Sequence, residues 1–180
     1  MIYIETPRLI LRDWKEEDLE PFRKLNLDEE VMRYFPKTYS EEETDAFYKV
    51  IKKEFEECKY GLYAVEVKES KEFIGFIGFH RPSFEADFTP CIEIGWRLKR
   101  DAWGKGYATE GAKACLKYGF TELNFKEVYS FTAKINKPSE KVMKKIGMQY
   151  VKEFDHPKLE PNNKLCKHVL YVIRNTDISR

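Results

Sequence analysis

The chain has 180 residues, of which 42% are hydrophobic and 35% are charged, a composition typical of a folded globular protein. It carries 32 Lys and Arg against 31 Asp and Glu, so the net charge of +1 gives no reason to expect a nucleic acid or a membrane as partner. No apolar run approaches the roughly 20 residues of a membrane span, and the first residues lack the apolar centre of a signal peptide. We therefore expect one cytoplasmic domain over residues 1–180.

The cysteines and histidines are few and widely spaced. No CxxC motif occurs, and the spacing matches neither zinc ligands nor a disulfide framework. These residues are Cys58, Cys91, Cys115, Cys166, His80, His156 and His168. We expect reduced, mostly buried thiols and no metal site.

The hydrophobic pattern predicts strands that alternate with helices. Strands are expected at residues 8–14, 62–68, 72–80, 91–100, 126–135, 148–156 and 165–174. Helices are expected at residues 15–26, 40–61, from the loop after residue 100 to about Leu123, and at 136–147. This order predicts a mixed α/β domain.

The helix expected over residues 40–61 has clear start and stop signals. Ser40 and Glu43 are spaced as a capping box. The expected apolar stripe comprises Phe47, Val50, Ile51 and Phe55. Gly61 is the expected stop.

The stretch RDAWGKGYATEGAKA, residues 100–114, places two glycines around a lysine at the start of a predicted helix. Glycine lets the backbone turn tightly and brings its N–H groups close to a ligand. The first N–H groups of a helix lack intrahelical acceptors and carry partial positive charge, so this loop predicts a phosphate or pyrophosphate site. Arg100 and Lys105 add positive charge, and Thr109 adds a hydroxyl.

Other interpretations of this loop compete. A P-loop requires GxxxxGK[ST], which is absent. A dinucleotide fingerprint requires GxGxxG, but Thr109 stands at the third glycine and no acid ends the next strand at residues 132–134. From this loop alone, a glycine-rich turn without a ligand is the remaining alternative.

Three separated blocks resemble the GNAT superfamily of N-acetyltransferases: TPRLILRDW near the start, WGKGYATE in the middle and NKPSEKVMKKIG further on. They most resemble the branch of the ribosomal-protein-alanine N-acetyltransferases, and the resemblance covers nearly the whole chain. It implies an α/β (α+β) fold with a twisted, mixed, mostly antiparallel sheet of about seven strands and about four helices. The sheet would be splayed between its fourth and fifth strands.

The resemblance also implies acetyl-CoA as cosubstrate, wedged in that gap. Backbone groups of Trp96, Arg97 and Leu98 would bond the pantetheine arm as an added strand does. Asn136 would bond the pantetheine from beyond the sheet. The pyrophosphate would lie on Trp103, Gly104, Lys105, Gly106, Tyr107, Ala108 and Thr109.

The sequence departs from the family pattern at two positions. Asp101 stands where the loop motif usually begins with Arg or Gln, and its alternative role is to cap the following helix. Met143 stands where many members have a tyrosine that protonates the leaving thiolate. Ser139 is the local substitute for this acid, and a small residue needed for helix packing is the alternative interpretation.

Glu93 is the candidate general base. It stands between Ile92 and Ile94 in an otherwise apolar strand, where a carboxylate facing the cleft would take the amine proton through a water. The alternative is an ion pair with a surface lysine. A backbone N–H of the same strand is the candidate donor to the carbonyl oxygen of the thioester.

His80 and Phe84 are candidates for the acceptor pocket, with a structural histidine and a core aromatic residue as the alternatives. The segments FDHP and KHVLY resemble a subgroup of the branch. This resemblance implies that His156 and His168 lie close together on adjacent strands, as structural or pocket-wall residues.

Together these features predict an acetyl-CoA-dependent N-acetyltransferase that acts on a primary amine. The branch resemblance implies a protein N-terminus as acceptor, and a small molecule such as an antibiotic, a polyamine or an amino acid is the alternative. Asp101 and the missing tyrosine leave a non-catalytic acyl-CoA-binding module as another class, and a nicotinamide-binding domain is a third. Relatives commonly form homodimers.

Overall fold

The computed structural model describes residues 1–178. Its strands are β1 (Ile2–Glu5), β2 (Leu9–Arg12), β3 (Leu62–Val67), β4 (Phe73–His80), β5 (Glu93–Leu98), β6 (Glu127–Ala133), β7 (Gln149–Asp155) and β8 (Lys167–Arg174). Its helices are α1 (Leu19–Leu27), α2 (Glu41–Cys58), α3 (Tyr107–Thr121), α4 (Lys137–Lys145) and α5 (Asn175–Ile178), with 3₁₀ turns η1 (Glu16–Asp18) and η2 (Arg100–Ala102).

The described residues form two compact units. The first unit contains residues 1–79 and 95–115, and the second unit contains residues 80–94 and those from 116 onward. β5 and α3 run from one unit into the other. The single domain expected over residues 1–180 stays a prediction.

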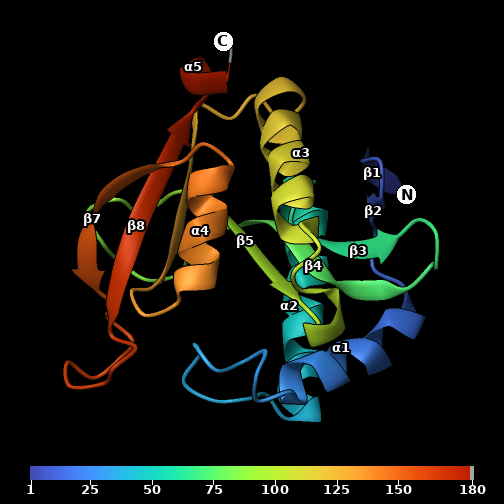
Figure 1. Ribbon diagram of the computed structural model, residues 1–180, viewed down its shortest axis with the longest axis horizontal. Helices are drawn as coiled ribbons and strands as arrows, with labels where there is room; N and C mark the ends of the chain where they lie inside the picture. The colour runs from blue at the N-terminus through green and yellow to red at the C-terminus, as the bar shows by residue number, and fades with distance from the viewer. Residues whose placement is uncertain (179–180) are drawn as a thin grey trace. The chain divides into compact units, whose positions relative to one another are not determined.

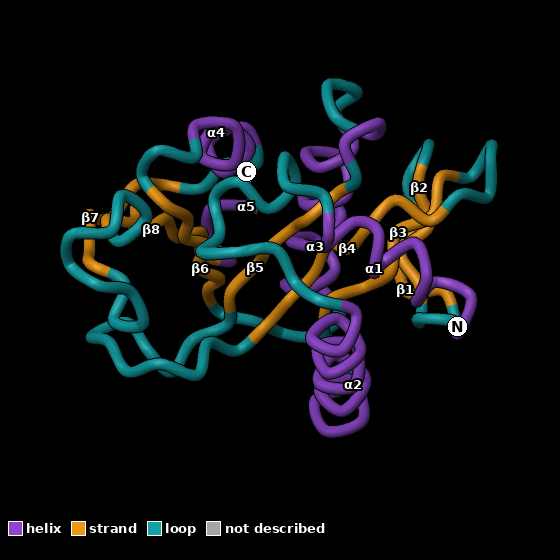
Figure 2. Tube along the Cα trace, turned by 90° about the horizontal axis from the view of Figure 1, so that it is seen from below, coloured by secondary structure: helices purple, strands orange, loops and turns teal. Residues whose placement is uncertain are grey.

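The strands follow the hydrogen-bonded order β1-β2-β3-β4-β5-β6-β8-β7. In the first unit β1 to β4 pair antiparallel, and Figure 2 shows β1, β2 and β3 side by side. In the second unit β8 pairs antiparallel with β6 and β7, whereas β5 and β6 are parallel with one registered pair, Glu93 opposite Tyr129. This single pair joins the fourth and fifth predicted strands, where the resemblance implies a splay. The predicted α+β fold with a mixed, mostly antiparallel sheet is confirmed.

β1 is an additional strand that the hydrophobic pattern did not predict. Its alternation is weak, because Ile2 is 51% exposed and Ile4 is the one well-buried apolar residue of the strand. The strand forms because β2 offers a free edge, and it pairs there with Glu5 opposite Ile10.

The predicted capping box of α2 is confirmed, since the Glu43 N–H donates to Ser40 Oγ and the Ser40 N–H donates to Glu43 Oε1. The predicted stop is wrong, because α2 ends at Cys58 and Lys59 takes the left-handed conformation with φ of 65°. Gly61 is required for a different reason: a Cβ there would lie 2.9 Å from the Phe55 ring.

The predicted apolar stripe of α2 is wrong at Val50, whose side chain is 51% exposed. Tyr48 and Ile51 are buried, and Phe47 and Phe55 pack beside them. The stripe is therefore rotated away from Val50, because the helix docks through its aromatic residues.

In the first unit, α1 and α2 cover one face of the strands and the first half of α3 covers the other. The core under α1 and α2 includes Phe22, Ile51 and Phe76. Ile77, the next residue of β4, projects to the opposite face, where it leaves no room for a Cβ on Gly111 of α3.

In the second unit, α4 and the loop after β4 lie on opposite faces of the strands. The Tyr171 hydroxyl of β8 donates to Glu140 of α4 at 2.7 Å, and Figure 1 shows α4 beside β8. Tyr171 stands opposite Ser130, so the next residue, Phe131, projects to the other face and contacts Phe84 of the loop. Within residues 1–178, no helix combines the length and the apolar character of a membrane span.

Candidate functional site

The glycine loop of the first unit has the backbone that its sequence predicts. Gly104 and Gly106 have φ of 72° and 80°, in the left-handed region that favours glycine. No atom lies within 4 Å of the position of a Cβ on Gly104, and the nearest atom to one on Gly106 is Arg8 Nη2 at 3.4 Å. The glycines therefore serve the turn and leave the space above it open.

The backbone N–H groups from Gly104 to Thr109 donate no hydrogen bond to any of the described residues, and Glu110 N is the next N–H that does, to Gly106 O at 3.0 Å. These donors lie at the N-terminus of α3, where the helix dipole adds positive potential. Consecutive free N–H groups of this kind suit the oxygens of a pyrophosphate. The backbone of this loop thus offers donors for an anion without the use of a side chain.

Arg8 and Glu110 hold this loop in place through hydrogen bonds, a role that the sequence did not reveal. Arg8 Nε donates to Glu110 Oε2 at 2.7 Å, and Arg8 Nη1 donates to Lys105 O at 2.8 Å. The Arg8 guanidinium also lies 4.5 Å from the centre of the Tyr107 ring. Burial alone would raise the pKa of Glu110, but hydrogen bonds from Thr6 and Arg8 lower it overall.

In the strand predicted to bind pantetheine, at least one backbone group is already hydrogen-bonded within the protein. Leu98 O accepts the indole N–H of Trp103 at 2.8 Å, so this carbonyl is already used. The side chain of Arg97 is buried and donates to Asn26 Oδ1 at 2.7 Å. Trp96 is half-buried, and Trp103 is 45% exposed. All four residues belong to the first unit, together with the glycine loop.

Asn136 and Ser139 lie together at the start of α4 in the second unit. Asn136 is the N-cap, and its Oδ1 accepts from Ser139 N at 3.3 Å while its Nδ2 donates to Thr132 Oγ1 at 2.9 Å. One hydrogen of the Asn136 amide is left for a ligand. Met143 is 1% exposed, so the family's tyrosine position is filled here by a core residue.

Glu93 begins β5 within the second unit and is half-buried. Residues in register on neighbouring strands project to the same face, so Glu93 shares a face with Tyr129. The Tyr129 ring lies 5.9 Å from Phe88, which belongs to an aromatic cluster on that face. His80 ends β4 at the start of the loop that carries Phe84 and Phe88.

Phe84 is a member of this aromatic cluster. The cluster comprises Phe84, Phe88, Phe131, Phe154, His156 and His168. The rings of His156 and His168 lie 5.0 Å apart, so the predicted proximity holds, although His156 lies just after the end of β7 and only His168 is on a strand. Burial, followed by His168 and Lys158, lowers the pKa of His156 to about 4, so the imidazole is neutral at neutral pH.

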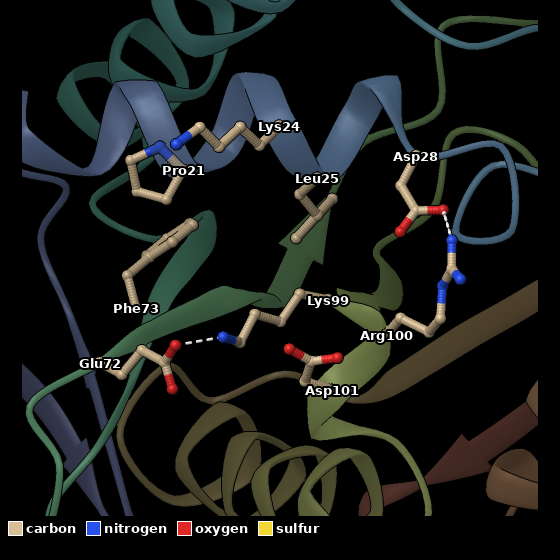
Figure 3. A pocket seen from close by; sticks show the side chains of 9 residues that line it. All are labelled: Pro21, Lys24, Leu25, Asp28, Glu72, Phe73, Lys99, Arg100 and Asp101. Carbon is tan, nitrogen blue, oxygen red and sulfur yellow. Dashed lines mark hydrogen bonds and ion pairs between the residues drawn. The ribbon is translucent and has the colours of Figure 1, made fainter.

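An open depression of about 460 Å³ lies under α1 in the first unit (Figure 3). Arg100 forms an ion pair with Asp28 at 2.5 Å across its rim, and this hydrogen bond lowers the pKa of Asp28. Arg100 is therefore already neutralised, contrary to the expectation that it adds charge to the phosphate loop. Asp101 also lines the depression and lies in η2, ahead of Tyr107 where α3 begins, so it does not cap that helix.

The four cysteines are free thiols, and only Cys115 and Cys166 are buried. The expectation of mostly buried thiols is thus met by two of the four. Within residues 1–178, no three His, Cys, Asp or Glu side chains gather as a group that could hold a metal ion.

Comparison with known proteins gives one family. The family described as Acetyltransferase (GNAT) domain matches residues 8–149. The chain belongs to the GNAT family of acetyltransferases. The uncharacterized N-acetyltransferase YnaD of Bacillus subtilis (strain 168) is 34% identical over 82% of this chain and 83% of its own length.

A second relative and a solved structure complete the comparison. Spermidine N(1)-acetyltransferase of Escherichia coli (strain K12) is 29% identical over 81% of this chain and 75% of its own. The crystal structure of a GNAT-family acetyltransferase from Bacillus anthracis has a TM-score of 0.81 at 29% identity and covers 98% of this chain and 99% of that one. This GNAT protein is therefore an acyltransferase that takes its acetyl group from acetyl-CoA and transfers it to an amine.

Proposed function

We propose that this GNAT enzyme transfers acetyl directly from acetyl-CoA to a primary amine in a ternary complex. The free N–H groups from Gly104 to Thr109 carry the proposal, because they form an anion site whose donors nothing else in the described chain uses. When bound there, acetyl-CoA supplies the activated acetyl thioester. Trp96 to Leu98 and Asn136 are proposed to hold the pantetheine.

Glu93 is the proposed general base. An amine attacks a thioester only when it is neutral, so a carboxylate that takes its proton through a water promotes the attack. The C–N bond forms as the C–S bond breaks, and the thiolate needs a proton. Ser139 is the proposed donor of that proton, which its hydroxyl takes back from solvent, because its N–H is fixed by Asn136 while its hydroxyl has no hydrogen bond among residues 1–178.

Direct transfer is favoured over an acetyl-cysteine intermediate. Cys91 lies two residues before the proposed base, but burial, followed by Glu93 and Glu127, raises the pKa of its thiol to about 12. A thiol with this pKa carries almost no thiolate at neutral pH and is a poor nucleophile. We therefore expect kinetics in which both substrates bind before either product leaves.

The acceptor that the sequence resemblance favours is a protein N-terminal α-amine. Its ordinary pKa of about 8 makes it easier to deprotonate than a lysine-like amine with a pKa near 10.4. A small-molecule amine is the second candidate, supported by the spermidine N(1)-acetyltransferase relative. A cytoplasmic location fits both acceptors.

The first test is a thermal-shift titration with acetyl-CoA, followed on the same sample by thiol release with N-terminal peptides and small amines. A shift with release supports the enzyme and identifies the acceptor class. A shift without release from any amine favours the binding module. A shift with NADH in place of acetyl-CoA would favour the nicotinamide interpretation.

Glu93→Gln tests the proposed base. We expect turnover to fall about 100-fold or more while the thermal shift with acetyl-CoA persists. Glu69→Gln, an exposed change in the turn between β3 and β4, is the matched control. Full activity of Glu93→Gln across the pH range would assign Glu93 to a structural ion pair instead.

A further inference from the structure

The side chain of Arg97 is a buried cation with no acidic partner among the described residues. It is 8% exposed, and Nη1 donates to Asn26 Oδ1. Nε is buried and makes no hydrogen bond. Burial lowers the pKa of Arg97, and nearby Tyr39 acts in the opposite direction.

Arg12, in the same unit, shows how this chain normally buries a guanidinium. Arg12 is 6% exposed, and it binds Asp18 at 2.8 Å and Glu66 at 2.8 Å. A buried charge without such partners is costly, because the energy of solvation by water is lost and nothing replaces it. Arg97 therefore lacks a counter-charge that Arg12 has.

Aromatic rings supply part of the missing stabilisation. The Arg97 guanidinium carbon lies 4.6 Å from the centre of the Phe35 ring, 5.2 Å from Phe76, 5.5 Å from Tyr39 and 5.8 Å from Phe47. Phe47 and Phe76 belong to the packing under α1 and α2, but Phe35 is 38% exposed. Phe35 is thus the ring that faces solvent over the cation.

The free edge of the guanidinium has the geometry of a carboxylate receptor. Asn26 is fully buried, and its amide donates to Thr44 Oγ1 at 3.1 Å, which turns Oδ1 toward Arg97. Asn26 uses Nη1 and Nε makes no hydrogen bond, so the Nε edge of the guanidinium is left for a ligand, with the Tyr39 side chain beside the guanidinium. Two parallel N–H groups on one edge match the two oxygens of a carboxylate.

The side chain of Arg97 points away from the proposed coenzyme loop, which favours the acceptor over the coenzyme as its ligand. Its backbone lies in the strand proposed to bind pantetheine. The guanidinium then enters the packing of α1 and α2, on the face opposite α3 and its phosphate loop.

We propose that Arg97, oriented by Asn26 and covered by Phe35, recognises a carboxylate carried by the amine acceptor. The inference rests on the proposed transferase function and specifies its substrate class: an amine that also bears a carboxylate. This carboxylate belongs to a free amino acid or to an acidic side chain near the N-terminus of a peptide. The Phe35 ring moves aside when the carboxylate binds.

The test compares acceptors that differ only in the carboxylate. One arm pairs free amino acids with their decarboxylated amines, and the other pairs N-terminal peptides with Asp or Asn at the second position. In one of the two arms, we expect the wild type to prefer the carboxylated acceptor by about 10- to 100-fold in kcat/KM. The arm that shows this preference identifies whether the carboxylate belongs to a free amino acid or to a peptide side chain. Arg97→Met should abolish this preference, and Arg97→Lys should restore part of it.

The melting temperatures of variants distinguish a role of Arg97 in acceptor recognition from a structural role. Arg97→Met should melt no lower than the wild type, because it removes an unpaired buried charge, whereas Arg12→Met should melt clearly lower. Arg23→Met, which removes a half-buried guanidinium paired with Asp45, should keep the acceptor preference. Phe35→Ala should retain the preference and lower KM for the carboxylated acceptor, and this variant leaves Arg97 in place if Arg97→Met does not fold.

A binding measurement keeps the two proposals distinguishable. If no amine releases thiol, the transferase proposal fails, and β-alanine and ethylamine are then compared by thermal shift on the protein loaded with coenzyme A. A larger shift with β-alanine that Arg97→Met removes still supports the carboxylate site. The carboxylate site is overturned if the wild type uses or binds both members of a pair equally, or if the preference survives Arg97→Met. It is also overturned if Arg97→Met lowers only the affinity for acetyl-CoA.

Discussion

Arg8 Nε and Glu110 Oε2 lie 2.7 Å apart, although 102 positions separate the two residues in the chain. This contact ties the segment before β2 to the first turn of α3. The Arg8 backbone N–H donates to the same carboxylate at 2.9 Å, and Arg8 Nη1 reaches the carbonyl of Lys105. The shape of the proposed coenzyme loop therefore depends on a residue far from it in sequence.

Glu110→Gln should weaken this support. We expect a loss of about 1–2 kcal/mol in the free energy of unfolding, because a charged hydrogen-bonded pair becomes a neutral one, and a weaker affinity for acetyl-CoA. Urea unfolding and calorimetric titration measure the two effects. Glu57→Gln, which breaks an exposed pair with Lys53, is the control and should change neither.

The contribution of Glu110 should depend on pH in a defined direction. Its pKa in the folded protein is lower than the ordinary 4.5, so the folded state favours the ionised form. The stability it adds is present above pH 4.5 and is lost as the pH falls through the lower folded value. The stability gap between the wild type and Glu110→Gln should therefore shrink in acid, and a gap that grows would contradict this assignment.

Gly106→Ala should impair coenzyme binding more than Lys105→Ala does. An alanine at φ of 80° costs about 1–2 kcal/mol and shifts the loop backbone. Removal of the Lys105 side chain leaves the N–H groups in place. Acetyl-CoA titrations of both variants measure the difference, and a larger effect of Lys105→Ala would mean that side-chain charge and not the backbone binds the phosphates.

Ser139→Ala tests the proposed acid. We expect the rate of thiol release to fall about 100-fold while acetyl-CoA binding persists, because protonation of the leaving thiolate is lost. Ser70→Ala, in the turn between β3 and β4, is the control. An unchanged rate would assign Ser139 to packing at the start of α4.

His156 should titrate far below an ordinary histidine. Its folded pKa of about 4, against an ordinary 6.5, means that the unfolded chain takes up a proton first as the pH falls. The contribution of His156 to stability is present above pH 6.5 and is lost between there and pH 4. NMR titration measures the pKa, and His156→Gln should lose less stability than the wild type between pH 7 and 5. A measured pKa near 6.5 would show that the imidazole is solvated.

Local features of the site could be predicted from the sequence. Gly104 and Gly106 signalled the tight turn, Ser40 with Glu43 signalled a helix start, and the hydrophobic pattern signalled the strands β6 and β8. Each of these signals depends on contacts between residues that are neighbours in the chain. The family resemblance added the proximity of His156 and His168, which the structure places 5.0 Å apart.

By itself, the sequence determined the order of the elements after β1, the glycine turn at the start of α3 and the family, because these follow from local backbone preferences, hydrophobic period and motif. The tertiary structure decided which side chains meet. It paired Arg8 with Glu110, left Val50 outside the core and buried Arg97 among aromatic rings without an acid. Such contacts depend on the register of strands and the rotation of helices, since an arginine in a strand reads the same in sequence whether its partner is a carboxylate, a ring or a ligand.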